Sequence, residues 1–555
     1  MVDSDARRSV EPVVEPVVEP VVGAVVEPVV GAVVGAVKGG GAMVESLVEA
    51  VAGHARSQPE RPAILFEGAT ISYGQLFADV ERFARALRLA GLAAGDCVGL
   101  FLENSPAFAV AYLGVNLAGG VVTLINTQYR QVELSHILSD ARVRYCVTSP
   151  AGAAELRMLD LAEPPTLIIV GQSASEPPAL AYEAFLCTGD DAPAVALALP
   201  AADTPAVIGY TSGTTGRSKG AVLLHRNLVA NITAVTTAWR WTPSDRLLLT
   251  LPLFHAHGLM VGLHGSLWMG GSVALRRRFD AAETLADFDA DAQISLFFGV
   301  PTMYGRLVAE AERRPLPAHL PRLFVSGSAP LSPQLFAQFE ALFGQRILER
   351  YGMTETGMNL TNPHDGERRA GTVGGPFPGQ EARIVEAHGR YPLPPAVVGE
   401  IEVRGPHVFA GYLNRPDATA EAMTPDGWFK TGDLGWVSDD GYYTITGRAR
   451  ELIISGGYNI YPREIEDALT EHPAVAEVAV LGAPDADLGE QVVAFVVPQP
   501  GQAPTPEELI AWCRQRLASF KKPRHILFVE SLPRNVLGKT QKHLLSARLP
   551  ADLRG

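Results

Sequence analysis

The segment from Tyr210 to Gly220 reads YTSGTTGRSKG and contains glycines, hydroxyl side chains and one lysine but almost nothing that packs a core. Glycines permit backbone conformations with positive φ, and hydroxyl and free N–H groups donate hydrogen bonds to anionic oxygens. These residue types predict a loop that binds phosphate. The spacing is not that of a Walker loop, which has four residues between its first glycine and Gly-Lys-Ser/Thr. Another chemistry that holds polyphosphate is therefore indicated.

Four further segments follow in one order along the chain: ERYGMTET (349–356), GWFKTGDLG (427–435), GRARELIISGGYNIYPREIE (447–466) and PRNVLGKTQK (533–542). With the glycine-rich segment, they resemble the adenylate-forming superfamily of acyl-CoA synthetases, luciferases and peptide-synthetase adenylation domains. The resemblance covers about residues 55–545. It implies an enzyme that joins a carboxylate to AMP, releases pyrophosphate and passes the acyl group to a thiol. ATP, Mg²⁺ and CoA are the implied cofactor and co-substrates.

Attack of a carboxylate on the α-phosphate of ATP brings two anions together. The enzyme therefore needs groups that neutralise charge and hold the reactants in line. The resemblance implies that the glycine-rich segment grips the β- and γ-phosphates, which leave as pyrophosphate. The residues implied are Thr211, Ser212, Gly213, Thr214, Thr215 and Lys219. The alternative interpretation of this segment is a surface turn without a ligand.

The motifs around ERYGMTET and TGDLG imply a nucleotide site. Tyr351 resembles the ring that stacks on adenine, Thr354 a phosphate contact, and Glu355 the Mg²⁺ ligand, with Thr211 as a second ligand. Mg²⁺ prefers hard oxygen ligands, which a carboxylate and a hydroxyl supply. Asp433 resembles the acid that accepts both ribose hydroxyls. The other residues expected at the nucleotide are Ser328 in SGSAP (326–330), Glu349 and Arg448.

Lys539, near the end of the chain, resembles the catalytic lysine that bridges the substrate carboxylate and the α-phosphate. Lys542 is the neighbouring alternative, and Gly538, directly before Lys539, favours Lys539. A compact ammonium on a long stem suits a group that a mobile domain carries into the site. The family rotates its C-terminal domain between the two half-reactions, which implies a pivot at Arg450.

After that rotation, Gly456 and Gly457 are expected to line the path of the pantetheine arm of CoA, because glycine lets a ligand approach the backbone. The basic segment Lys521-Lys522-Pro523-Arg524 has two interpretations. It either binds the phosphates of CoA or forms an ordinary solvated turn.

The segments LPLFHAHGL (251–259) and GVPTMYGRL (299–307) resemble malonyl-CoA synthetases, including forms that act on methylmalonate. A pocket for malonate has to pair the carboxylate that does not react, because a buried unpaired charge is costly. Arg306, in a helix that Thr302 begins, is the candidate cation on the pocket floor. The alternative is an exposed helix arginine, and Arg276-Arg277-Arg278 is a second cationic cluster, more typical of a surface turn.

Two more residues are expected at the acyl group. His255 is expected to line the acyl pocket and to take part in catalysis, with a structural hydrogen-bonding role as the alternative. Met353 is bulky enough to shorten the pocket for a three-carbon acid. A core methionine would look the same in the sequence.

The main alternative function is a ligase for a medium-chain or aromatic acid, which predicts that Arg306 faces away from the acyl site. A peptide-synthetase domain is disfavoured because no carrier segment follows Lys542, and nothing beyond the fold indicates a luciferase. A regulatory nucleotide-binding protein is disfavoured because the set of expected catalytic side chains is complete: Lys219, Glu355, Asp433 and Lys539.

The composition narrows the class of protein. With 46 Lys and Arg against 60 Asp and Glu, the formal net charge is −14, which argues against a nucleic-acid or anionic-membrane binder. The four cysteines are far apart and have no paired spacing, so we expect a reducing compartment, the cytoplasm. The sequence contains no uninterrupted apolar run of about 20 residues, so a membrane span is not predicted.

Short apolar runs alternate with helical patterns after Met43, which predicts an α/β fold with largely parallel sheets. We expect a large N-terminal domain of stacked mixed sheets and helices, residues 43–449, and a small mobile α+β C-terminal domain, residues 450–555. Residues 1–42 repeat Glu-Pro or Gly-Ala with Val-Val. Prolines at this spacing interrupt helices and central strands, so a low-complexity disordered tail is expected there.

Overall fold

The computed structural model of the chain describes residues 44–171, 179–190, 196–211, 218–386, 391–456, 458–485, 487–535, 538–550 and 553–554. The expected tail of residues 1–42 lies outside these ranges. Ser212, Gly213, Thr214, Thr215 and Gly457 of the expected site also lie outside them. The described residues after Met43 belong to one compact unit.

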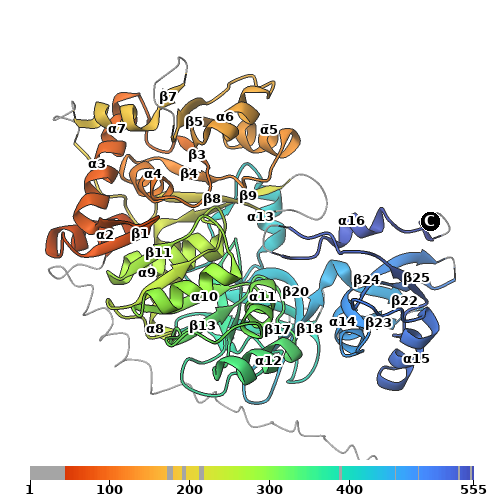
Figure 1. Cartoon of the computed structure of the whole chain (residues 1–555). Coiled ribbons are helices and arrows are strands. Elements are labelled where there is room, and N and C mark those ends of the chain that lie inside the picture. Colours follow the sequence, from red (N-terminus) through yellow and green to blue (C-terminus); the bar gives the residue numbers. More distant parts are fainter. Residues whose placement is uncertain are drawn as a thin grey trace, which may run out of the picture. The chain divides into compact units, whose positions relative to one another are not determined.

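The first large sheet has nine strands in the order β16-β15-β14-β13-β12-β10-β11-β1-β2. Strands β1, β11 and β13 of this sheet are labelled in Figure 1. Its six central strands are parallel neighbours, and β2, β15 and β16 pair antiparallel at the edges. The strands are β1 (Pro62–Phe66), β2 (Ala69–Ser72), β10 (Arg246–Leu249), β11 (Ser272–Leu275), β12 (Ile294–Gly299), β13 (Leu323–Ser326), β14 (Leu348–Met353), β15 (Gly357–Thr361) and β16 (Gly375–Pro376).

The second large sheet has eight strands in the order β19-β9-β8-β4-β3-β5-β6-β7. It is parallel from β8 to β7, and the pairs β8–β9 and β9–β19 are antiparallel. The strands are β3 (Cys97–Phe101), β4 (Val121–Leu124), β5 (Val143–Thr148), β6 (Thr166–Ile169), β7 (Leu180–Ala181), β8 (Pro205–Thr211), β9 (Lys219–Leu224) and β19 (Gly411–Tyr412).

Helices cover both sheets, because their central strands are buried on both faces. Contacts among α2, α3, α4, α8 and α9 form one layer, and α5 and α6 pack on the eight-stranded sheet. Helices α10, α11 and α12 pack on the nine-stranded sheet through an aromatic core. The helices are α2 (Leu47–Ser57), α3 (Tyr73–Leu89), α4 (Pro106–Leu117), α5 (Gln131–Asp140), α6 (Pro150–Arg157), α7 (Tyr182–Asp190), α8 (His225–Ala238), α9 (His264–Met269), α10 (Ala281–Ala290), α11 (Pro301–Ala311), α12 (Pro333–Phe343) and α13 (Pro416–Ala422), with a π-helical turn at His257–Leu263.

A smaller four-stranded antiparallel sheet, β17-β18-β20-β21, follows in the chain, and its last strand leads into a 3₁₀ turn, Ala449–Glu451. The C-terminal part then forms a five-stranded sheet with its own apolar clusters. The elements are β17 (Glu381–Val385), β18 (Gly399–Arg404), β20 (Phe429–Val437), β21 (Tyr443–Arg448), β22 (Ile453–Ser455), β23 (Tyr458–Ile460), β24 (Val475–Asp485), β25 (Gly489–Pro498), β26 (His525–Phe528), α14 (Pro462–Thr470), α15 (Pro506–Arg516) and α16 (Lys542–Ser546).

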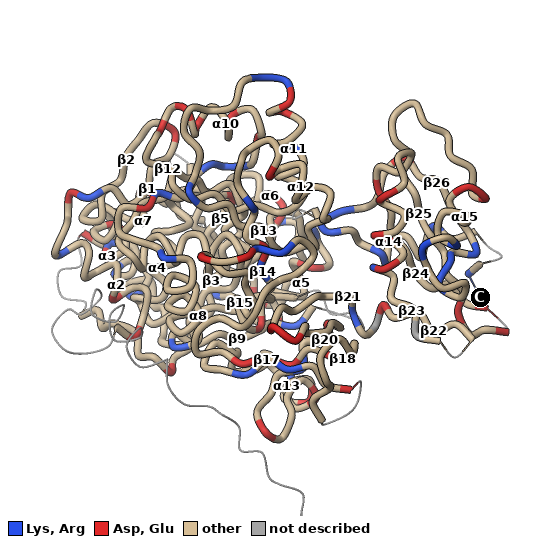
Figure 2. The backbone as a smooth tube through the Cα atoms, turned by 90° about the horizontal axis from the view of Figure 1, so that it is seen from below, with Lys and Arg blue, Asp and Glu red and all other residues tan. Residues whose placement is uncertain are grey.

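The structure confirms the expected fold class, with a large N-terminal and a small C-terminal domain of mixed α/β structure. Helix α3 shows why local signals were reliable: Ser72 and Gln75 form a capping box at its first turn. Basic and acidic residues are interspersed along both parts of the chain (Figure 2). Within the expected cluster Arg276-Arg277-Arg278, Arg276 pairs with Asp287 and Arg277 with Glu67.

Candidate nucleotide and acyl site

The carboxyl ends of parallel strands meet at one edge of a sheet, and ligands of α/β proteins bind outside that edge. In the nine-stranded sheet, β10, β12, β13 and β14 are parallel neighbours. The expected site residues follow the ends of these strands: His255 after β10, Thr302 after β12, Ser328 after β13 and Glu355 after β14. The sheet order therefore gathers segments that are up to 100 residues apart.

The expected ribose site is assembled around Asp433. Its carboxylate is buried, its Oδ1 lies 3.0 Å from Arg448 Nε, and its Oδ2 accepts a hydrogen bond from the hydroxyl of Tyr351. The Asp433 carboxylate raises the pKa of Arg448. The structure thus brings together three residues that the sequence placed at the nucleoside, from β14, β20 and β21. The carboxylate already accepts from two donors, which fits a group that recognises a pair of hydroxyls.

Glu355 is a buried carboxylate next to the phosphate segment. Its Oε1 accepts a hydrogen bond of 3.0 Å from the Tyr412 hydroxyl, and the Thr211 side chain also bonds to it. Burial raises the pKa of Glu355 despite these hydrogen bonds. A single carboxylate with a neighbouring hydroxyl is a donor set that fits Mg²⁺, which takes most of its other ligands from phosphate and water. The two residues expected as metal ligands are therefore adjacent.

Tyr412, on β19, is a site residue that the sequence did not reveal. Its ring supports Lys219, whose Nζ lies 4.4 Å from the ring centroid, and its hydroxyl bonds Glu355. Cation–π contacts of this kind hold an ammonium group at a defined place. The segment GYLNRP around Tyr412 carries no phosphate-binding signature, so only the pairing of β19 with β9 brings it to the site.

Thr354 packs against Gly209, a residue of the eight-stranded sheet. A Cβ atom at Gly209, on β8, would lie 2.4 Å from Thr354 Cγ2, so only glycine lets β8 and the turn after β14 approach so closely. Thr354 and Thr211 are both half-buried. The two sheets therefore meet at the expected phosphate site, with one hydroxyl residue from each.

Two residues expected at the nucleotide lie in polar but enclosed surroundings. Glu349 is buried; its Oε1 accepts from Leu331 N at 2.9 Å, and its Oε2 has no hydrogen-bond partner among the described residues. Burial raises the pKa of Glu349 to about 8. Ser328 has φ 67°, a left-handed conformation that is uncommon for a residue other than glycine, and its Oγ lies 3.3 Å from His257 Nδ1.

A buried arginine on β14 lies near His255, a residue expected at the acyl group. Arg350 is buried, and its Nε and Nη2 have no hydrogen-bond partner among the described residues. Its guanidinium packs on the backbone of Gly327, where a Cβ would lie 2.5 Å from Arg350 Cζ. Burial lowers the pKa of Arg350 to about 9. Because buried charges are normally paired, this guanidinium has unused capacity to bind an anion.

His255 lies near the same arginine. It is half-buried, and its Nδ1 accepts a hydrogen bond of 3.3 Å from His257 N. Burial, with Arg350 and Lys539 nearby, lowers the pKa of His255 to about 4, so the ring is neutral near pH 7. Met353 ends β14 and is half-buried, with its Sδ 3.8 Å from the Tyr351 hydroxyl. His255 thus follows β10, whereas Arg350 and Met353 belong to β14, and β12 and β13 lie between these two strands in the sheet.

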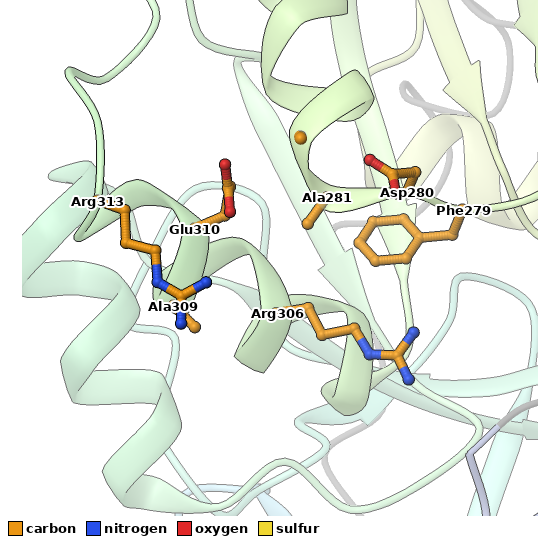
Figure 3. Close-up of a pocket in the computed structure, with 8 residues that line it drawn as sticks. Phe279, Asp280, Ala281, Arg306, Ala309, Glu310 and Arg313 are labelled. Atoms are coloured by element: carbon orange, nitrogen blue, oxygen red, sulfur yellow. The ribbon is translucent and has the colours of Figure 1, made fainter.

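Arg306 does not lie on a buried pocket floor, contrary to the sequence-based expectation. Its side chain is exposed and lines a surface pocket with Phe279, Asp280, Glu310 and Arg313 (Figure 3). The reason is the helical period: the buried face of α11 consists of Met303, Tyr304, Leu307, Val308 and Ala311, which leaves position 306 outside. Arg306 forms no ion pair with the described residues.

Lys539 and Lys542 have different surroundings. Lys539 is half-buried in a turn in which its backbone N–H donates to Asn535 Oδ1 at 2.9 Å. The neighbouring Gly538 has φ 73° and packs against Thr302 at the start of α11. Lys542 instead lies between two carboxylates, with its Nζ 2.8 Å from Glu466 Oε1 and 3.3 Å from Glu451 Oε2. Of the two alternatives, Lys539 is the one next to the strand-end residues.

The other expected residues of the C-terminal domain are at its surface. Gly456 lies in an exposed turn with φ 58°. Lys521 pairs with Glu464, Lys522 Nζ donates to Ser519 O at 2.9 Å, and Arg524 pairs with Asp485 at 3.3 Å. These partners favour the interpretation of the basic segment as a surface turn.

No helix in the described ranges is long and apolar enough to cross a membrane. In the same ranges, no three or more His, Cys, Asp or Glu side chains gather in a way that could hold a metal ion.

The fold and this site identify the class of protein: the chain belongs to the AMP-binding enzyme family, which its sequence matches over residues 51–413. Residues 464–539 match the AMP-binding enzyme C-terminal domain. Members of this family with which the chain aligns include several acid–CoA ligases, and the chain is such a ligase, which uses ATP and CoA.

Three relatives show to which members of this family the chain is similar. It is 39% identical to the sulfoacetate–CoA ligase of Cupriavidus necator, over 90% of this chain and 97% of the relative. It is 34% identical to a malonate–CoA ligase of Arabidopsis thaliana, over 92% and 89%. The crystal structure of ATP-bound MatB from Rhodopseudomonas palustris superposes with a TM-score of 0.82 at 38% identity, over 91% of this chain and 98% of that one.

Proposed function

We propose that the chain is an ATP-dependent ligase for a short carboxylic acid that carries a second anionic group, with malonate or methylmalonate as the substrate. In this proposal the enzyme forms malonyl-AMP and pyrophosphate and then transfers the malonyl group to CoA with release of AMP. The observation that carries the proposal is the buried guanidinium of Arg350, with two N–H groups that lack partners in the described residues, beside His255.

The chemistry of the acid supports this choice. A buried cation without a partner is costly, and a ligand that brings a carboxylate restores the pairing. The acids in the names of two of the relatives, malonate and sulfoacetate, both carry an anionic group one carbon away from the carboxylate that reacts. A fatty or aromatic acid would leave Arg350 unpaired. Arg306 is exposed in a surface pocket and has no part in this proposal.

The residues of this chain divide the adenylation step among them. Lys219 and Thr211 bind the leaving phosphates, Tyr351 and Asp433 hold the nucleoside, and Lys539 lies between the substrate carboxylate and the α-phosphate. Glu355 and Thr211 would hold Mg²⁺, which supplies charge neutralisation to the phosphates when bound. His255 is neutral at pH 7 and packs against the acid without adding charge.

For the second half-reaction we propose that the C-terminal domain, residues 450–555, turns at Arg450. This movement removes Lys539 and brings Gly456 and Gly457 to the acyl-AMP, where their lack of side chains admits the pantetheine arm. We also propose that the enzyme works in the cytoplasm. All four cysteines are free, which suits a reducing compartment.

A panel of acids tests the proposal directly. Purified enzyme is assayed for acid-dependent exchange of labelled pyrophosphate into ATP with malonate, methylmalonate, sulfoacetate, octanoate and benzoate. Malonate or methylmalonate is expected to support the fastest exchange. Exchange with octanoate or benzoate but not with malonate would reject the proposed substrate, and fastest exchange with sulfoacetate would keep the buried cation but change the acid.

A further inference from the structure

Helix α5 contacts both strands that border the glycine-rich segment. His136 Nε2 lies 2.7 Å from the carbonyl oxygen of Ser218, directly before β9. One helical turn later, Asp140 Oδ2 accepts a hydrogen bond of 2.7 Å from the hydroxyl of Tyr210, the second-to-last residue of β8. Residues at i and i+4 share one face of a helix, so His136 and Asp140 bind the two strands from the same side.

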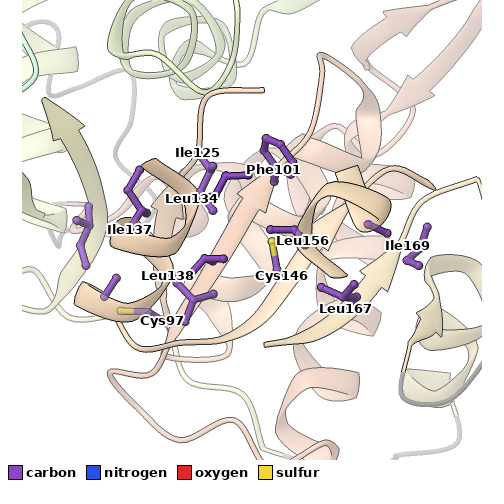
Figure 4. Close-up of a cluster of buried hydrophobic side chains, with 14 of the residues drawn as sticks. Cys97, Phe101, Ile125, Leu134, Ile137, Leu138, Cys146, Leu156, Leu167 and Ile169 are labelled. Atoms are coloured by element: carbon purple, nitrogen blue, oxygen red, sulfur yellow. The ribbon is translucent and has the colours of Figure 1, made fainter. Parts of the chain in front are cut away.

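The opposite face of α5 fixes the helix to the sheet. Leu134, Ile137 and Leu138 are buried in the apolar cluster that covers the eight-stranded sheet (Figure 4). The Glu133 side chain accepts from Arg130 N at 3.2 Å, which caps the first turn. The helix is therefore a fixed support, and its two polar contacts transmit that position to the strand ends.

The strand ends that α5 holds carry the side chains expected at the phosphates. Thr211 follows Tyr210 directly, and Lys219 follows Ser218 directly. Thr211 and Lys219 face each other as the last pair of the β8–β9 ladder, and the Thr211 hydroxyl bonds Lys219 O at 3.4 Å. From this pair the contacts continue to the proposed metal ligand, because Thr211 bonds Glu355.

The same helix also supports the strand that carries Tyr412. Asn414 Nδ2 donates to the carbonyl oxygen of Asp140 at 3.0 Å, and Leu413 N donates to Gly220 O at 2.8 Å. Residues in or next to β8, β9 and the distant strand β19 thus all bond to the C-terminal half of α5. Each of these strands holds a residue that contacts Glu355 or Lys219.

We propose that His136 and Asp140 are positioning residues for adenylation: through Ser218 and Tyr210 they set where Thr211 and Lys219 meet the triphosphate of ATP. The inference rests on the proposed function and names residues that do not touch the reactants. The set His136, Asp140, Tyr210 and Ser218 is called the α5 clasp. The clasp matters only while pyrophosphate is present, because acyl-AMP no longer contains the β- and γ-phosphates.

The first test removes the hydrogen bond of His136 and keeps a ring. The ring stands edge-on to Tyr210 with centroids 5.9 Å apart, so His136→Phe keeps this packing and loses the ring nitrogens. We expect a rise in KM for ATP in pyrophosphate exchange of about 5- to 10-fold, the size that one hydrogen bond supports. Thioester formation from preformed acyl-AMP and CoA is expected to stay within about twofold. His136→Gln, which restores an N–H donor, is expected to recover most of the loss.

A matched control separates positioning from general stability. His54 also bonds a backbone carbonyl through Nε2, at 3.1 Å from Trp268 O. His54→Phe is therefore expected to lower the unfolding temperature as much as His136→Phe does but to leave KM for ATP unchanged. Equal rises in KM for both variants would overturn the positioning role, and so would equal losses in the two half-reactions.

The second test combines a variant of each of the two contacts of the α5 clasp. Tyr210→Phe removes the hydroxyl that bonds Asp140, and Tyr145→Phe, which removes a hydroxyl bonded to Ala90 O in the same sheet, is its control. Because both contacts hold one pair of strand ends, His136→Phe and Tyr210→Phe are expected to be less than additive in KM for ATP. Fully additive effects on KM for ATP would show that the two contacts act independently and would overturn the proposal.

Direct binding of ATP keeps this inference distinct from the choice of acid. Calorimetric titration of the full chain with ATP needs no acid substrate. His136→Phe is expected to weaken ATP binding about 5-fold or more while His54→Phe matches the unaltered protein. Unchanged ATP affinity in His136→Phe would overturn the clasp, whichever acid the enzyme activates.

Discussion

The residue that decides the substrate in this account is Arg350, which sits inside the motif ERYGMTET between two residues expected at the nucleotide. The sequence placed Glu349 and Tyr351 at the nucleotide but left Arg350 without a role. Only the structure shows that it is buried and lacks partners for two of its N–H groups in the described residues. The resemblance of the motif to the family implied roles at the nucleotide and none at the acid.

Replacement of Arg350 by glutamine should remove the pairing of the second anionic group. KM for malonate is expected to rise about 100-fold, because a buried charge pair loses one partner. KM for ATP should change little. The relative rate with propionate, which lacks the second carboxylate, should increase. Arg350→Gln with an unchanged preference for malonate over propionate would contradict the assignment, and circular dichroism checks that the variant is folded.

A second prediction concerns Lys539. Lys539→Ala should abolish the formation of acyl-AMP, since it removes the ammonium group near His255 that we propose lies between the two anionic reactants. Transfer from preformed acyl-AMP to CoA should remain within a fewfold of the unaltered rate. The two half-reactions are measured separately, by pyrophosphate exchange and by thioester formation. A loss of equal size in both would refute the proposed role.

At the scale of elements, local signals in the sequence were sufficient for most helices and strands. The expected alternation of short apolar strands with helices is found, for example, in the succession α4, β4, α5, β5 and α6. Arg306 shows what such signals miss. The motif gave its helix correctly, but which face of α11 is buried depends on packing against β12, β13 and α12.

The sequence also left Lys539 and Lys542 as alternatives, and their elements separate them. Lys542 begins α16 and bridges the 3₁₀ turn Ala449–Glu451 to α14, through Glu451 and Glu466. Burial alone would lower the pKa of Lys542, but the two carboxylates outweigh it and raise the pKa. Its ammonium group therefore connects α16, the 3₁₀ turn and α14 next to the proposed pivot at Arg450.

Removal of the ion pairs of Lys542 should lower the local stability of the C-terminal domain. Lys542→Met leaves two carboxylates without their partner, and we expect a loss of about 3 kcal/mol in local stability. Hydrogen exchange of α14, followed by mass spectrometry, should become faster. Lys542→Met combined with Glu451→Gln and Glu466→Gln should restore most of the protection. Unchanged exchange in the single variant would show that the bridge contributes nothing.

At the scale of the whole molecule, the large domain contains several buried histidines that are neutral. Burial lowers the pKa of His225, His255 and His407 to about 4 and that of His264 to about 3, and it lowers the pKa of His257 as well. Between pH 6.5 and 4 the unfolded chain binds protons at these rings and the folded chain does not. The free energy of unfolding therefore falls as the pH falls through this window.

Each such histidine contributes a slope of up to about 1.4 kcal/mol per pH unit. Acid unfolding is expected to be steep and to be complete near pH 4 or above. His407→Gln keeps a hydrogen-bonding side chain for Asn359, to which His407 Nε2 is bonded at 3.1 Å, and should reduce the slope by one proton. Denaturant titrations at several pH values measure it. A variant with the slope of the unaltered protein would contradict this account.

The arrangement of the two large sheets could be predicted only as a class. Alternating strands and helices indicated parallel sheets, but the pairing of β19 with β9, which brings Tyr412 to Glu355, joins segments almost 200 residues apart and has no local signal. The contact of Gly538 with Thr302 is equally non-local. Family motifs supplied the residues of the nucleotide site, whereas packing supplied the supports that hold them.

The central claim is that a buried guanidinium selects an acid with a second anionic group. The most direct measurement compares kcat/KM for malonate and for propionate in ATP- and CoA-dependent release of AMP. The two acids have three carbons each and differ in the second carboxylate. We predict a ratio of at least about 100 in favour of malonate. A ratio near one, or a preference for propionate, would contradict the claim.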